Sequence, residues 1–208
     1  MASADLLRWA VAAGLVLAAH HSSAVPPPLP QTGAECERPT YASDWVVCGD
    51  AALLALDRRL SAAWQAITAA RPATQKAIDL PPLLEAQEAW FGRRSRCAFV
   101  ETHAACLQAA YDDRARVLDA WARAASGALV GSGARVRCAN APWGNATVIV
   151  HRPTADALVV SGLDGRALAI ATPGGGPDGW RPFVQFDGAT QPIRLRPLSG
   201  DAITCSPE

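Results

Sequence analysis

Six cysteines are the residues of this chain whose type and number point most directly to a chemistry, the formation of disulfide bonds. They are Cys36, Cys48, Cys97, Cys106, Cys138 and Cys205. An even number of cysteines in an exported chain is the signature of a disulfide framework. A metal site is a weaker interpretation, because the sequence has no Cys-x-x-Cys pair and its only histidines beyond residue 24, His103 and His151, fall in different predicted domains. We therefore expect three disulfides, no bound metal and no other cofactor.

Neighbouring carboxylates are the next candidates for chemistry, since two acids can serve as general acid and general base. Glu85 with Glu88 and Asp112 with Asp113 lie beside arginines on predicted helices, and a solvated, charge-balanced helix face is the interpretation that we favour. The sequence has no Gly-x-Ser-x-Gly elbow, and its cysteines are better explained as bridges than as thiolate nucleophiles. We expect a binding protein and no enzyme, with a hydrolase as the least favoured function.

The first 24 residues have the pattern of a signal peptide. Arg8 precedes an apolar run from Trp9 to Ala19, and the small residues 22–24 provide a cleavage site. The apolar run is too short for a stable membrane anchor after cleavage. Lys+Arg and Asp+Glu are equal at 19 each, so bulk charge favours neither a nucleic acid nor a membrane surface as partner. We predict a periplasmic or secreted protein, and the sequence sets no oligomeric state.

The elements that position the first four cysteines are three predicted helices within a domain over residues 36–126, which follows a Pro-rich linker at residues 25–35. The first long helix begins after Asp50, which we expect to cap it, and ends at Arg71-Pro72. The second begins at Pro81 and Pro82 and runs to about residue 94, and the third covers about residues 101–125. Helical spacing predicts buried positions at Leu53, Leu56, Leu60, Trp64, Ile67, Leu107, Tyr111, Leu118 and Trp121.

A three-helix bundle of this size has a modest core and needs disulfide staples. An up-down-up arrangement places Cys48, Cys97 and Cys106 at one end of the bundle. We favour the pairs Cys36–Cys97 and Cys48–Cys106, and three connectivities stay open for four cysteines.

A Gly-rich hinge at residues 127–133 separates the helices from a predicted β domain at residues 134–208. Seven short runs in this half have strand composition, and turn signals lie at Asp164-Gly165, Asp187-Gly188 and residues 199–201. Short strands with tight turns predict a small antiparallel barrel or sandwich. Cys138 in the first run and Cys205 in the last are natural disulfide partners, so the fold class is α + β in two domains.

The helical half resembles the LprI-type lysozyme-inhibitor domain of exported bacterial proteins. The resemblance covers about residues 36–119 and rests on the four cysteines and on the pattern Gln87-x-x-Trp90-Phe91-x-x-Arg94-x-x-Cys97 followed by Cys106-Leu107-x-x-x-Tyr111-x-x-Arg114, with Cys48, Asp50, Leu53, Leu56-Asp57 and Leu60 upstream. The second half is similar, more loosely, to the MliC-type inhibitor barrel, whose first and last strands share a disulfide. It lacks that family's tyrosine and lysine, so no inhibitory residues carry over.

These resemblances imply an envelope protein that binds and blocks a lysozyme, most simply one of the chicken type. The lysozyme-contact candidates are Arg93, Arg94, Arg96, Trp180, Arg181 and Arg194. For Arg94 a structural ion pair with Asp50 or Asp57 is the favoured role. The alternative function is an envelope interaction module that binds peptidoglycan, glycan or another exported protein without inhibiting lysozyme.

Overall fold

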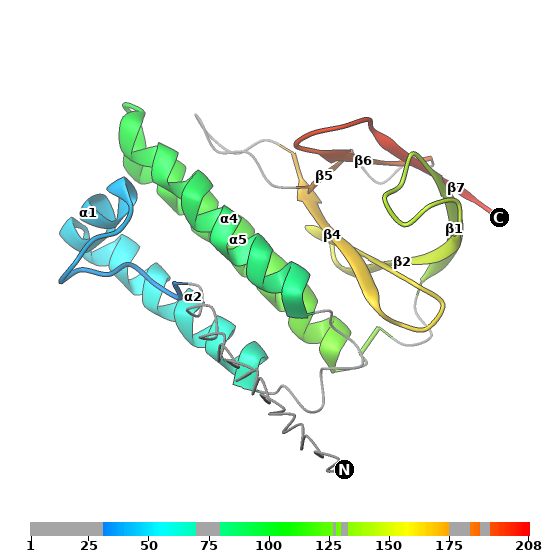
Figure 1. Cartoon of the computed structure of the whole chain (residues 1–208), viewed down its shortest axis with the longest axis horizontal. Helices are drawn as coiled ribbons and strands as arrows, with labels where there is room; N and C mark the ends of the chain where they lie inside the picture. The colour runs from blue at the N-terminus through cyan, green and yellow to red at the C-terminus, as the bar shows by residue number, and fades with distance from the viewer. Residues whose placement is uncertain (1–30, 70–79, 127, 130–132, 175–183, 188–191) are drawn as a thin grey trace, which may run out of the picture.

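The computed structural model of the chain is an α + β structure in which helices lie beside a closed barrel of seven strands (Figure 1). The structure describes residues 31–69, 80–126, 128–129, 133–174, 184–187 and 192–208. The predicted signal peptide, the first part of the linker and most of the predicted hinge lie outside these residues. Within the described ranges, no helix combines the length and the apolar character needed to cross a membrane.

The helical part consists, among the described residues, of four α-helices and one 3-10 helix. They are α1 (Ala42–Gly49), α2 (Ala51–Ala69), α4 (Leu80–Arg94), η1 (Ser95–Phe99) and α5 (His103–Ala125). The predicted start of α2 is confirmed, since Asp50 Oδ1 accepts hydrogen bonds from the backbone N–H groups of Ala52 at 2.8 Å and Leu53 at 3.1 Å. The predicted prolines stand in the first turn of α4. The end predicted at residues 71–72 lies outside the described part.

Helix α5 is the central element of the molecule. It packs against α2 on one side and against β3 and β4 of the barrel on the other, and α4 runs beside it (Figure 1). The residues predicted to be buried on α5 are buried, as are those on α2, with Leu56 half-buried. One hydrophobic cluster joins these helix faces to Ala157, Val159, Ala167 and Ile170 of the barrel. An independent three-helix bundle and a two-domain division stay predictions, because barrel side chains complete the helical core.

The predicted β half forms a closed barrel in the order β1-β2-β3-β4-β5-β6-β7. The strands are β1 (Ala134–Ala139), β2 (Thr147–Thr154), β3 (Ala157–Ser161), β4 (Ala167–Pro173), β5 (Val184–Asp187), β6 (Ile193–Pro197) and β7 (Ile203–Pro207). All neighbours pair antiparallel except β4 and β5, which are parallel. A second cluster, which includes Val136, Leu158 and Leu195, fills the barrel interior.

Two of the predicted turns are confirmed. Gly165, between β3 and β4, has φ +81° and Gly200, between β6 and β7, has φ +88°, a region that glycine enters without a steric penalty. The turn predicted after Asp187 falls mainly on residues that the structure does not describe. Closure of the barrel brings Cys138 opposite Cys205 on β1 and β7, and the predicted bridge between them is present.

The favoured disulfide pairing of the helical half was wrong. The bridges are Cys36–Cys48 and Cys97–Cys106, each with 5.5 Å between its Cα atoms. The physical reason is that each pair closes a local turn: Cys36 precedes α1, which contains Cys48, and Cys97 in η1 is followed at once by the start of α5. All six cysteines are therefore bridged, and three disulfides indicate an oxidising, non-cytoplasmic location.

Candidate functional site

A buried ion-pair network holds the end of α4 in place. The Arg94 side chain is fully buried and its Nη2 atom forms an ion pair with Asp44 of α1. Its Nη1 atom lies 3.4 Å from Asp57 Oδ1 of α2 and also donates to the hydroxyl of Tyr111 on α5. The Tyr111 hydroxyl in turn donates to Asp57 Oδ1 at 2.7 Å, and burial raises the pKa of this phenol, which keeps its proton. One arginine thus connects four helices.

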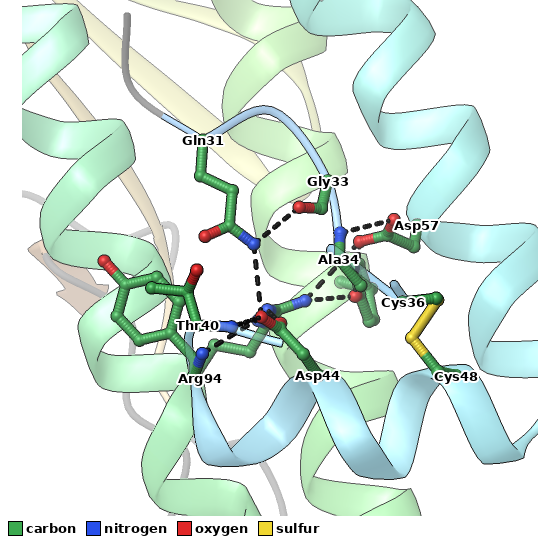
Figure 2. Close-up of a disulfide and its surroundings, with 11 residues drawn as sticks. Gln31, Gly33, Ala34, Cys36, Thr40, Asp44, Cys48, Asp57 and Arg94 are labelled. Carbon is green, nitrogen blue, oxygen red and sulfur yellow. Dashed lines mark hydrogen bonds and ion pairs between the residues drawn. A yellow bond between two sulfur atoms is a disulfide. The ribbon is translucent and has the colours of Figure 1, made fainter. Parts of the chain in front are cut away.

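The same carboxylates fasten the segment that precedes α1. Asp44 Oδ2 accepts hydrogen bonds from the backbone N–H of Thr40 at 3.1 Å and from Gln31 Nε2 at 3.2 Å, and Asp57 Oδ2 accepts from Ala34 N at 2.9 Å (Figure 2). Residues 31–34, which belong to the predicted linker, are therefore tied to the helices by hydrogen bonds. In Figure 2 this segment and the Cys36–Cys48 bridge flank the two carboxylates.

Aromatic rings surround the buried guanidinium group. Its central carbon lies 4.6 Å from the ring centroid of Phe91, 5.3 Å from that of Trp90 and 5.6 Å from that of Tyr111. Cation–π contacts of this kind are strongest where water is excluded. The Trp90 indole N–H also donates to the carbonyl of Ala110 at 3.3 Å. The residues that carry the helical sequence pattern are therefore packing and ion-pair residues of the core.

This network supports a rigid, solvent-facing surface at one end of the helical part. Helix η1 begins directly after Arg94 and is closed by the Cys97–Cys106 bridge, and α1, which packs against η1, is closed by Cys36–Cys48. We call the end of the helical part formed by α1 and η1 the pinned end, and its exposed side chains include Trp45 of α1 and Arg96 and Phe99 of η1. Phe99 is 79% exposed and Trp45 is 70% exposed, and Arg96 is also exposed. Exposed aromatic and arginine side chains on a rigid base are typical of protein-binding hot spots.

The predicted contact residues differ in their exposure to solvent. Arg96 is exposed on η1, Arg194 is exposed on β6, and Arg93 is half-buried at the end of α4. The prediction of Arg94 as a contact residue was wrong, because its side chain is buried. The ion pair predicted between Arg94 and Asp57 is confirmed, and Asp50 caps α2 instead. Trp180 and Arg181 lie outside the described residues.

Two exposed aromatic residues, Trp45 and Phe99, were not among the predicted contact residues. Phe99 lies in a 3-10 helix of five residues, too short for an apolar periodicity to be judged. Trp45 sits on a helix of eight residues whose buried positions are Ser43, Asp44 and Val47. The signal that was available was their closeness in sequence to Cys48 and Cys97, which restrain both segments.

A concave region lies between the helices and the barrel. It is a cleft of about 490 Å³ lined by Asp113, Arg114 and Trp121 of α5 and by barrel residues that include Trp143, Ile170 and Thr172. Asp113 is buried, so its predicted place on a solvated helix face was wrong. Strand β4 packs against α5, and Thr172 Oγ1 of β4 donates a hydrogen bond to Asp113 Oδ1 at 2.5 Å. Burial raises the pKa of Asp113.

Arg114 on α5 is the second buried arginine of the sequence pattern, after Arg94 on α4. Its Nε atom donates to Gln87 Oε1 of α4 at 2.8 Å, and burial lowers its pKa to about 10, so it remains a cation at neutral pH. Within the described part of the chain, no cluster of three or more His, Cys, Asp or Glu side chains is placed to hold a metal ion. Comparisons with protein-family models, with curated proteins and with solved structures found no match to this chain.

Proposed function

We propose that this chain is an exported bacterial envelope protein, periplasmic or secreted, that binds and inhibits a lysozyme without catalysing a reaction. The cysteine, aromatic and arginine pattern that resembles the LprI-type domain supports this function. The three disulfides support export to an oxidising compartment.

The observation that carries the proposal is the geometry of the pinned end. Arg96 and Phe99 project from a helix of five residues that is fixed on one side by the buried ion pairs of Arg94 and on the other by the Cys97–Cys106 bridge. A side chain held on a rigid base loses little conformational entropy when it binds. The pinned end can therefore insert into a cleft at low ordering cost.

The chemistry of the target explains why an arginine is suited to this task. A lysozyme cleaves its glycan with two carboxylates that flank the scissile bond in a cleft. We propose that the guanidinium group of Arg96 forms charge-assisted hydrogen bonds with these carboxylates, while Phe99 packs against apolar residues of the cleft. Such an insertion blocks the substrate and removes the acid from proton transfer.

One described pair, His151 and Ser161, has the spacing of a nucleophile and its base. His151 Nε2 lies 2.9 Å from Ser161 Oγ, a distance at which a histidine can activate a hydroxyl. Both side chains are buried in the barrel, at 6% and 4% exposure, so a substrate has no access to this pair. We assign the pair a structural role.

Lysis of a cell-wall suspension tests the proposal. Chicken-type lysozyme is titrated with the oxidised mature protein, and the assay is repeated with goose-type and invertebrate-type enzymes. We expect stoichiometric loss of lysis with the chicken type. No effect of a large molar excess on any of the three enzymes would refute inhibition.

The second candidate function is an envelope interaction module, and the exposed Trp45 favours it. An exposed indole can stack on a sugar ring as readily as it can fill a protein pocket. The balanced charge also provides no long-range attraction to a basic lysozyme. Retention of the protein on purified peptidoglycan, lost in Trp45→Ala and with lysis unaffected, would support this module over the inhibitor.

A further inference from the structure

The cleft between α5 and the barrel has the dimensions and walls of a small-molecule site. Its volume of about 490 Å³ lies in the range typical of ligand pockets. The helices contribute Trp90, Val117 and Trp121 to its walls, and the barrel contributes Leu168, Val184 and Ile203. Figure 1 shows α4 and α5 beside the barrel, and side chains from both halves of the chain line the cleft. The lining is apolar over most of its area, which suits an aromatic or acyl group.

Two buried hydrogen-bond donors in this lining lack an acceptor. Arg114, which is 2% exposed, uses Nε to bond Gln87, but its Nη2 atom is buried and has no hydrogen-bond partner among the described residues. The indole Nε1 of Trp143 is likewise buried without a partner in the described part. A buried unpaired donor costs about 1–3 kcal/mol, and more when it is charged. A ligand with acceptor oxygens would satisfy both of these donors.

The charges around the cleft favour a negatively charged acceptor. Asp113, the carboxylate nearest in sequence to Arg114, is engaged by the Thr172 hydroxyl, and its Oδ1 lies 4.0 Å from Arg116 Nη2. Burial favours the neutral form of this carboxyl group. Asp201 also lines the cleft but is exposed, so solvent screens it. The guanidinium group of Arg114 thus remains the buried cation without a full counter-charge in the described lining.

We propose that this cleft binds an amphipathic carboxylic acid, with its apolar aromatic or acyl body between α5 and the barrel and its carboxylate accepting a hydrogen bond from Arg114 Nη2. Trp143 Nε1 supplies a second donor at the barrel wall. The site lies on residues other than those of the pinned end, and it does not depend on lysozyme inhibition.

Isothermal titration of the oxidised mature protein with a matched pair of probes tests the site. The probes are 2-naphthylacetate and the neutral alcohol 2-naphthaleneethanol, which share an apolar body and differ in the carboxylate. We expect the acid to bind at least about tenfold more tightly than the alcohol. Arg114→Met should remove this preference, whereas Arg123→Met, an exposed arginine on the same helix, should keep it.

A second pair of variants tests the site even if the Arg114→Met variant does not fold. Ala169, a half-buried residue of β4, lines the cleft, so Ala169→Trp should block binding of both probes while Arg114 is untouched. Ala63→Trp fills a separate apolar groove between α2 and α5 and should leave binding unchanged. Circular dichroism confirms that each variant is folded.

Three results would overturn the proposal. The absence of binding of either probe to the wild-type protein would mean that water satisfies Arg114. Equal affinities for the acid and the alcohol would remove the role of the cation. Loss of binding in Ala63→Trp but not in Ala169→Trp would place the ligand in the α2–α5 groove.

Discussion

Replacement of Arg94 by methionine is the sharpest test of how the helical part is held together. The substitution keeps an unbranched, buried side chain but removes the positive charge. Asp44 and Asp57 then stay in the core, with side-chain exposures of 0% and 5%, and lose the ion pairs that compensate them. Breaking a buried ion pair by removing one partner costs about 3–5 kcal/mol, because a charge is left uncompensated.

The expected loss for Arg94→Met lies near the middle of that range. Two carboxylates are left uncompensated, which raises the cost, but both keep hydrogen bonds, from Thr40 and Gln31 to Asp44 and from Ala34 to Asp57, which lowers it. We expect a loss of about 4 kcal/mol, a large part of the stability of a typical domain. For a chain of this length the melting temperature should fall by about 8–16 °C.

The assay is urea denaturation of the oxidised protein, followed by circular dichroism at a helix wavelength. Arg123→Met is the matched control, since Arg123 forms an exposed ion pair with Asp119 at 2.8 Å and should cost less than about 1 kcal/mol. Adding Asp44→Asn to Arg94→Met should recover part of the loss, because one buried charge is removed. A loss below about 1 kcal/mol for Arg94→Met would refute the reasoning.

Three further predictions follow from the fold. The pKa of Asp113 is raised in the native state, so the contribution of this carboxyl group to stability falls as pH rises from its unfolded pKa through its native pKa. Asp113→Asn should therefore be more stable than wild type at about pH 7.5, by a margin that shrinks toward about pH 4. A margin that thermal denaturation shows to be the same at both pH values would contradict this prediction. Ile170→Ala on β4 should cost about 2–4 kcal/mol and move the helical and barrel transitions together, as seen by far-UV and near-UV circular dichroism, whereas a shift of one alone would mean separate cores. A non-reducing peptide map should show a bridge between Cys97 and Cys106, and any other cysteine pairing would contradict the fold. Replacing both cysteines by serine should lower the free energy of unfolding by about 2.6 kcal/mol, from the chain-entropy model for a separation of 9 residues.

Periodicity and turn chemistry predicted the three long helices and the strand runs, but not η1. The Asp50 cap and the apolar spacing of Leu53, Leu60 and Trp64 define α2 because both signals are local. The strand runs and the turn at Gly165 are local as well. The pairing of Cys138 with Cys205 followed from their places in the first and last strands, once a closed sheet was assumed.

The disulfide pairing of the helical part and the cleft could not be predicted, because periodicity encodes neither local changes of chain direction nor the packing of one element on another. Each local cysteine pair is brought together by a change of chain direction, which periodicity does not encode. Asp113 and Arg114 have the composition of a solvated helix surface, and only the packing of β4 on α5 buries Asp113. Arg94 was expected to make a helix-end ion pair, but sequence alone did not reveal that two carboxylates and Tyr111 enclose it.

We propose that the pinned end blocks a lysozyme. The most direct measurement is the inhibition constant toward chicken-type lysozyme for wild type, Arg96→Ala, Phe99→Ala and the exposed control Arg123→Ala, which lies at the far end of α5 from the pinned end. We predict inhibition by wild type and the control, with a weakening of about tenfold or more in each pinned-end variant. Equal inhibition by all four proteins, or none by any of them, would contradict the claim.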